Sequence, residues 1–142
     1  MPYFIKQKLN LSELVQLDQR RQTVLLVEPE DYLRNLYSLY LSRQSFAVEH
    51  CLNSDELEAS INFLLPNVLV FSTSYFDKPI VAVRFLSRIR QQFPSLPVVA
   101  ITFNSSHDHL KQLVSAGVTS HIDRRLTRPE DLATIIKTLL FK

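Results

Sequence analysis

At 142 residues, the chain is long enough for one domain, and its net charge of +2 is too small to indicate general binding to nucleic acid or a membrane surface. One cysteine excludes a disulfide, and one glycine excludes the glycine-rich phosphate loops of nucleotide-binding proteins. No stretch approaches the ~18 uninterrupted apolar residues of a membrane span, and the first residues lack the apolar core of a signal peptide. We therefore expect a cytoplasmic protein.

The first half of the chain predicts two strands and two helices. The apolar run 23–27 is typical of a strand buried on both faces, and the acids that follow it favour the start of a helix that ends near Gln44. Residues 46–52 alternate between apolar and polar, which predicts a second, more exposed strand. Ser54 is predicted to cap the next helix, which extends to Leu65.

The second half continues the alternation of strands and helices. The predicted elements are a third strand ending at Ser72, a helix from Pro79, a fourth strand at 98–102, a helix capped by Ser105 or Ser106 and closed by Gly117, a fifth strand at 118–122, and a last helix whose capping box starts at Thr127. Five strands alternating with five helices imply an α/β domain with a parallel sheet covered on both faces. We expect this domain to occupy residues 23–142, and residues 1–22 to form an arm that packs on the domain or on a partner.

From Thr23 to about Leu140 the chain resembles the receiver domain of bacterial response regulators. The resemblance lies in the segments VLLVE, PNVLVFS and PVVAIT, in the AG pair before the fifth strand, and in the helix spacings. It implies a flavodoxin-like (βα)5 doubly wound parallel sheet with strand order 2-1-3-4-5 and a site between strands one and three. It also implies a role in two-component signal transduction.

The resemblance places degenerate residues at the phosphorylation pocket. Receivers hold Mg²⁺ with two adjacent acids, which align with Glu28 and Pro29, and their phosphoacceptor aspartate aligns with Ser72. The hydroxyl residue that senses the phosphoryl group is kept as Thr102, and the bridging lysine aligns with Arg124. A serine without a base is a poor nucleophile and a weak metal ligand. We therefore expect no metal, no cofactor and no catalysis.

Candidate partner-binding residues lie near the same pocket. Bulky aromatic side chains on the loops after strands three and four either cover the empty pocket or form an apolar patch. Arginines near the last helix suit carboxylates or phosphates, although Arg124 is expected to neutralise Glu28 across the pocket. The candidate set is Tyr75, Phe76, Phe103, His121, Arg125 and Arg128.

The predicted function is that of a stand-alone pseudo-receiver that binds another protein independently of phosphorylation. We expect no attached output domain, and the resemblance allows a homodimer through the face formed by the last two helices. One alternative is a phosphorelay response regulator with an atypical active site. A DNA-binding accessory protein is a disfavoured alternative, because the arginines of the helix from Pro79, which are Arg84, Arg88 and Arg90, are expected to be solvated.

Overall fold

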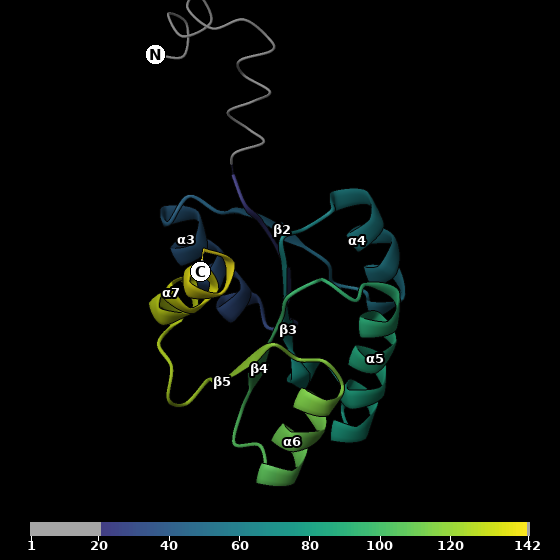
Figure 1. The fold of residues 1–142 in the computed structure, drawn as a ribbon. Helices are drawn as coiled ribbons and strands as arrows, with labels where there is room; N and C mark the ends of the chain where they lie inside the picture. Colours follow the sequence, from purple (N-terminus) through teal and green to yellow (C-terminus); the bar gives the residue numbers. More distant parts are fainter. Residues whose placement is uncertain (1–20, 142) are drawn as a thin grey trace, which may run out of the picture.

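The computed structural model describes residues 21–141, which form a single sheet of five parallel strands (Figure 1). The strand order is β2-β1-β3-β4-β5, so the flavodoxin-like fold and the order predicted from the sequence are confirmed. The strands are β1 (Thr23–Val27), β2 (Ala47–His50), β3 (Val68–Ser72), β4 (Val98–Thr102) and β5 (Ser120–Asp123).

Helices cover both faces of this sheet. In Figure 1, α3 and α7 lie on one side of the strands, and α4, α5 and α6 lie on the other. The helices are α3 (Asp31–Arg43), α4 (Leu57–Leu64), α5 (Pro79–Gln92), α6 (His107–Ser115) and α7 (Pro129–Leu140), with short 3₁₀ turns η1 (Ser54–Glu56) and η2 (Thr73–Tyr75).

Successive side chains of each central strand point alternately to the two faces of the sheet. Val24 and Leu26 of β1 pack against α3 and α7, whereas Leu25 and Val27 pack against the other three helices. Successive residues of a strand point to opposite faces, so a strand buried on both sides must be apolar throughout. This requirement explains the continuous apolar runs of β1, β3 and β4, and it fixes their register.

The structure corrects two predictions in the first half of the chain. Asn53 caps η1, the turn before α4, and its side chain accepts a hydrogen bond from the backbone N–H of Asp55 at 2.9 Å. The predicted cap Ser54 begins η1 instead, and α4 itself starts after Glu56, whose side chain makes no capping bond. Leu65 does not continue α4. It follows the helix in the left-handed conformation with an exposed side chain, because α4 ends one residue earlier.

In the second half, both predicted ends of α6 are confirmed, and two other predictions are corrected. Ser106 caps α6, and Gly117 follows that helix at φ 108°, as the sequence predicted. β5 starts two residues later than predicted. The capping residue of α7 is Arg128 rather than Thr127, and the Asp131 side chain accepts from its backbone N–H at 3.3 Å.

Of the predicted arm at residues 1–22, only Arg21 and Gln22 belong to the described residues, so the division into arm and domain stays a prediction. Among residues 21–141, no helix combines the length and the apolar character that crossing a membrane would require.

Candidate functional site

The predicted pocket lies at the carboxyl edge of the sheet, where β1, β3 and β4 end side by side. Ser72 is 2% exposed, and its hydroxyl lies 2.8 Å from the hydroxyl of Ser74. Thr102 is equally buried and donates its hydroxyl to the backbone oxygen of Ile122 at 3.0 Å. Both hydroxyl groups are therefore engaged by the chain's own atoms rather than presented to solvent.

Glu28 is the buried charge of this site. Its side chain is fully buried; Oε2 accepts the backbone N–H of Glu30 at 3.0 Å, whereas Oε1 has no partner among the described residues. Burial raises the pKa of Glu28, and the bond from Glu30, the Ser72 hydroxyl and the charge of Arg124 lower it to a smaller extent. A half-satisfied buried carboxylate is costly, so protonation or a nearby cation favours the folded state.

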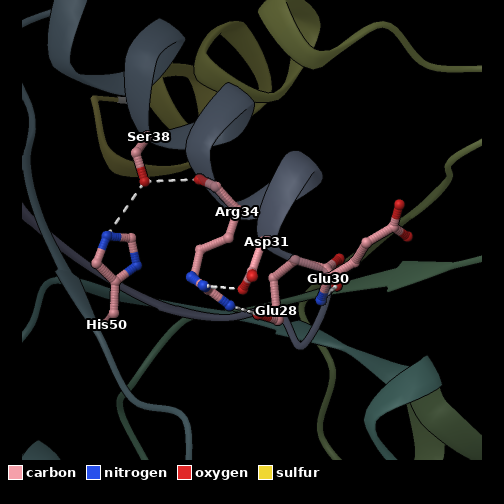
Figure 2. Close-up of polar contacts among 6 residues, drawn as sticks. All are labelled: Glu28, Glu30, Asp31, Arg34, Ser38 and His50. Carbon is pink, nitrogen blue, oxygen red and sulfur yellow. Dashed lines mark hydrogen bonds and ion pairs between the residues drawn. The ribbon is translucent and has the colours of Figure 1, made fainter.

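Arg34 binds the backbone of Glu28 rather than its carboxylate. Figure 2 shows its guanidinium group reaching from α3 to the end of β1, where it donates to the backbone oxygen of Glu28 at 3.0 Å and pairs with Asp31. Ser38, one turn further along α3, donates to the backbone oxygen of Arg34 at 2.7 Å and lies 3.3 Å from His50 Nε2. The sequence reasoning missed Arg34, although its spacing of three residues from Asp31 was a usable signal.

Arg124 is the cation nearest in effect to Glu28, because its charge lowers the pKa of that carboxyl as predicted, but its ion pair is with another residue. It pairs with Glu30 at 3.5 Å rather than with Glu28, because Glu30 caps α3 and its side chain extends toward the loop after β5. The Arg124 guanidinium also lies 4.7 Å from the ring centroid of Phe103, within cation–π range. Arg124 therefore acts on Glu28 by electrostatic attraction, without a direct ion pair.

These side chains leave almost no room above Ser72. The space lined by Ser72, Ser74, Thr102, Phe103 and Arg124 is about 10 Å³, which is enough for roughly one water molecule. A larger hollow of about 480 Å³ opens farther out, between the loops that carry Phe76 and Phe103. The pocket at the serine is filled, and only its rim is open.

The residues present do not fit the Mg²⁺ ion that the fold family implies. Mg²⁺ requires several oxygen ligands in octahedral geometry, and at this edge Glu28 offers one free carboxylate oxygen. Pro29 has no ligand atom in its side chain, and the cations Arg34 and Arg124 stand beside the carboxylates. Within residues 21–141, no group of three or more histidine, cysteine, aspartate or glutamate side chains is arranged to hold a metal ion.

The three candidate aromatic residues do not form one patch. Tyr75 and Phe76 pack in a cluster with Phe71 and Phe85, and the Tyr75 hydroxyl donates to the backbone oxygen of Leu52 at 2.9 Å. Phe76 also lines one wall of the outer hollow, whereas Phe103 lines the opposite wall and is 54% exposed. Tyr75 therefore ties two loops together, and Phe103 is the exposed member of the set.

The remaining candidates are separated as well. Arg125 pairs with Asp123 at 2.8 Å, which lowers the pKa of Asp123 to about 2, and its guanidinium lies 5.8 Å from the Phe103 ring. Arg128 pairs with Asp131 at the start of α7. His121 is exposed on β5 and lines a different hollow of about 470 Å³ beside α6. Of these three candidates only Arg125 adjoins Phe103, together with Arg124 of the pocket.

The arginines of α5 have structural partners. Arg88 pairs with Glu58 of α4 at 2.9 Å. Arg90 donates to the backbone oxygens of Phe93, Pro94 and Gly117, so it fastens the end of α5 to the turn before β5. Arg88 and Arg90 are therefore engaged within the fold, which disfavours DNA binding through this helix.

Comparison with known proteins supports the response-regulator receiver family. The chain is 25% identical over 130 residues to the transcriptional regulatory protein ResD of Bacillus subtilis, a match that covers 87% of this chain and 50% of ResD. The chain thus spans about half the length of this curated relative. No family model matches the chain.

Solved structures establish the fold. A response regulator from Thermotoga maritima superimposes with a TM-score of 0.75 at 18% identity, covering 86% of this chain and 99% of that one. A CheY-like receiver domain protein from Methanospirillum hungatei gives 0.74 at 20% identity, covering 84% and 94%. The fold is thus that of CheY-like receivers, and the residues at the carboxyl edge decide which chemistry the chain supports.

Proposed function

We propose that the chain is a pseudo-receiver that acts in signal transduction by binding another protein independently of phosphorylation. The observation that carries the proposal is the filled pocket at the end of β3. Ser72 is buried against Ser74, and the space above it is about 10 Å³. A phosphoryl group is larger than the single water molecule for which this space has room.

The charges around the pocket support the same proposal. Arg34 pairs with Asp31 and Arg124 pairs with Glu30, so the charges of these two carboxylates are offset without a divalent ion. Guanidinium groups are permanently charged and bind oxygens through several N–H donors, so this arrangement is stable in the absence of metal. The proposed module catalyses no reaction and takes no cofactor, and we place it in the cytoplasm.

The surface proposed for the partner is the crevice rim, defined as Phe103, Arg124 and Arg125. The Phe103 ring is half exposed and flanked by two guanidinium groups within 6 Å of its centroid. Aromatic and arginine side chains are the types enriched in protein interfaces and among their hot spots. The rim also borders the outer hollow, whose far wall carries Phe76.

A second proposed surface is the groove beside α6 that His121 and Val114 line, about 470 Å³ in volume. Its position on α6 and β5 suits a homodimer. The residues at 1–22 are proposed as a separate arm preceding the receiver-like domain at 23–142.

The proposal is tested by capturing partners from the native cell with the full chain as bait. Phe103→Ala removes the aromatic centre of the rim, and Leu39→Ala on α3 is a matched control, because Leu39 is also exposed but lies on another face. We expect the same partner to be retained by the wild type and by Leu39→Ala, with or without Mg²⁺ and acetyl phosphate, and to be lost with Phe103→Ala. Capture that requires the phosphodonor would contradict the proposal.

The alternative is a phosphorelay response regulator with an atypical active site. Two observations favour it: Glu28 keeps one free carboxylate oxygen, and Thr102 keeps the hydroxyl at the end of β4. It requires the rim to open and Ser72 to accept a phosphoryl group. Ser72→Ala separates the two functions, because it abolishes phosphorylation in the alternative and leaves partner binding unchanged in the pseudo-receiver.

A further inference from the structure

An apolar groove lies at the sheet edge opposite the phosphorylation pocket. It is formed where α4 leads into β3 and where α5 leads into β4, and its volume is about 440 Å³. Within residues 21–141, none of the residues that line it is charged, and the apolar side chains that matter below are Ile61, Leu65, Phe93 and Leu96. An open apolar groove of this kind is unfavourable in water unless something covers it.

Leu65, which lines this groove, combines a left-handed backbone conformation with an exposed side chain. Leu65 is left-handed, at φ 49° and ψ 56°, a conformation that a leucine adopts only under steric strain. Its side chain is nevertheless 76% exposed, and Phe63 in the last turn of α4 is 86% exposed. The domain therefore gains little from the position of Leu65 itself, and the side chain is available to a binding partner.

The chain enters the sheet next to this groove. Asn67, which lines the groove, accepts the backbone N–H of Thr23 through its side chain at 2.7 Å and donates its own N–H to the Thr23 oxygen at 2.9 Å. Twenty residues outside the described part precede Arg21, so the segment that leads into β1 starts beside the groove.

That segment contains an apolar stretch close enough in sequence to reach the groove. Leu11, Leu14, Val15 and Leu17 are spaced by one, two and three residues, which clusters them on one side of a helix or a compact turn. The six residue steps from Leu17 to Thr23 span up to about 20 Å when extended. A tether of this length gives an effective concentration in the millimolar range, which favours the chain's own segment over a free second copy.

We propose that the stretch Leu11–Leu17 of the same chain occupies the groove and covers Leu65. The uncharged lining matches a stretch whose only charged residue is Glu13, while the flanking charges Lys8 and Asp18 fall outside it. This docking is independent of the phosphorylation pocket and of the partner proposed for the crevice rim, because it uses the opposite edge of the sheet.

The test is paramagnetic broadening in NMR spectra of the isotope-labelled full chain. A nitroxide is attached at Asn62→Cys, an exposed position lining the groove, in a Cys51→Ala background. We expect the amide signals of residues 11–17 to lose most of their intensity, and to regain it when the nitroxide is reduced. A nitroxide at Leu126→Cys, in the loop between β5 and α7, is the matched control and should leave those signals intact.

Two variants show that the broadening reports docking. Leu14→Asp in the segment and Leu65→Asp in the groove should each restore the intensities of residues 11–17. Leu65 is exposed, and aspartate tolerates the left-handed conformation better than leucine, so neither change should alter the signals of the domain core. Broadening that persists in both variants would overturn the proposed contact.

A mixed sample distinguishes docking of the chain's own segment from docking of the same segment of a second copy. Isotope-labelled chain without nitroxide is combined with unlabelled chain that carries it at position 62, and we expect no broadening of residues 11–17. Broadening of residues 11–17 in the mixed sample would assign the groove to a second copy. Intact signals in every sample would show that the segment does not use the groove, and either result would overturn the inference.

Discussion

Replacing Glu28 by glutamine probes the buried charge at the centre of the pocket. Glu28 is fully buried, one of its oxygens has no partner among the described residues, and burial raises its pKa. Glutamine has the same shape and can still accept the backbone N–H of Glu30. The substitution therefore removes the charge and keeps the hydrogen bond.

We expect Glu28→Gln to stabilise the protein at neutral pH. A buried charge costs more free energy than a buried neutral amide, whereas the lost attraction to Arg124 and the unpaired amide N–H groups of the glutamine offset part of this difference, so a gain on the order of 1 kcal/mol is expected. For a chain of this size, such a gain raises the melting temperature by roughly 3–8 °C. Glu30→Gln is the matched control. Glu30 is exposed and forms an ion pair with Arg124, so Glu30→Gln should change the free energy of unfolding by no more than about 1 kcal/mol.

The pH dependence of the difference follows from the sign of the pKa shift. The folded-state pKa of Glu28 lies above its ordinary value of 4.5, so the wild type loses stability relative to the variant as pH rises from about 4.5 through the folded-state pKa. The advantage of Glu28→Gln should be small at pH 4 and should grow as the pH rises above 4.5.

Urea unfolding of wild type, Glu28→Gln and Glu30→Gln at a series of pH values measures this difference directly. If Glu28→Gln destabilises the protein at pH 7, or if its effect does not change with pH, then the carboxylate is stabilised in its charged form. Such a result would refute the claim that the buried charge of Glu28 destabilises the folded state. It would assign Glu28 a cation-binding role instead.

Three further predictions concern metal binding and two structural contacts. Millimolar Mg²⁺ should leave the melting temperature of the wild type unchanged relative to equal ionic strength of NaCl, whereas a site filled to one hundred times its Kd would add about 2.7 kcal/mol of stability. Gly117→Ala should lower the free energy of unfolding by more than about 1 kcal/mol in urea titrations, because the added Cβ would lie 2.6 Å from Arg90 Cγ at a backbone φ of 108°; an unchanged midpoint would show that Arg90 moves without cost. Tyr75→Phe should cost about 1–2 kcal/mol by the same assay, through loss of the hydroxyl bonds to Leu52 and Ser54, and should leave partner capture intact; loss of the partner instead would return Tyr75 to the binding surface.

The fold was predictable because local and long-range signals agree. Strands buried on both faces must be apolar throughout, so the segments at 23–27 and 98–102 were identified with their observed bounds. The helix caps were less predictable. Asn53, rather than Ser54, caps the turn before α4, because several adjacent polar residues can each accept the same backbone N–H and tertiary packing selects one of them.

The site was predictable in position but not in its contacts. Ser72 and Thr102 were placed correctly, because parallel strands bring their carboxyl ends to one edge. The partner of Arg124 was wrong, because Glu28 and Glu30 lie two residues apart and only the bend between β1 and α3 decides which of them reaches the loop after β5. For Arg34, the spacing of three residues predicts the pair with Asp31, but the bond to the backbone oxygen of Glu28 carries no sequence signal.

The most direct test of phosphorylation-independent function is the intact mass of the full chain after incubation with Mg²⁺ and acetyl phosphate. A receiver domain with aspartate at the end of its third strand is treated in parallel to show that the donor is active. We expect the mass of this chain to stay unchanged while the control gains a phosphoryl group. A stoichiometric phosphoryl adduct that Ser72→Ala removes would contradict the pseudo-receiver function.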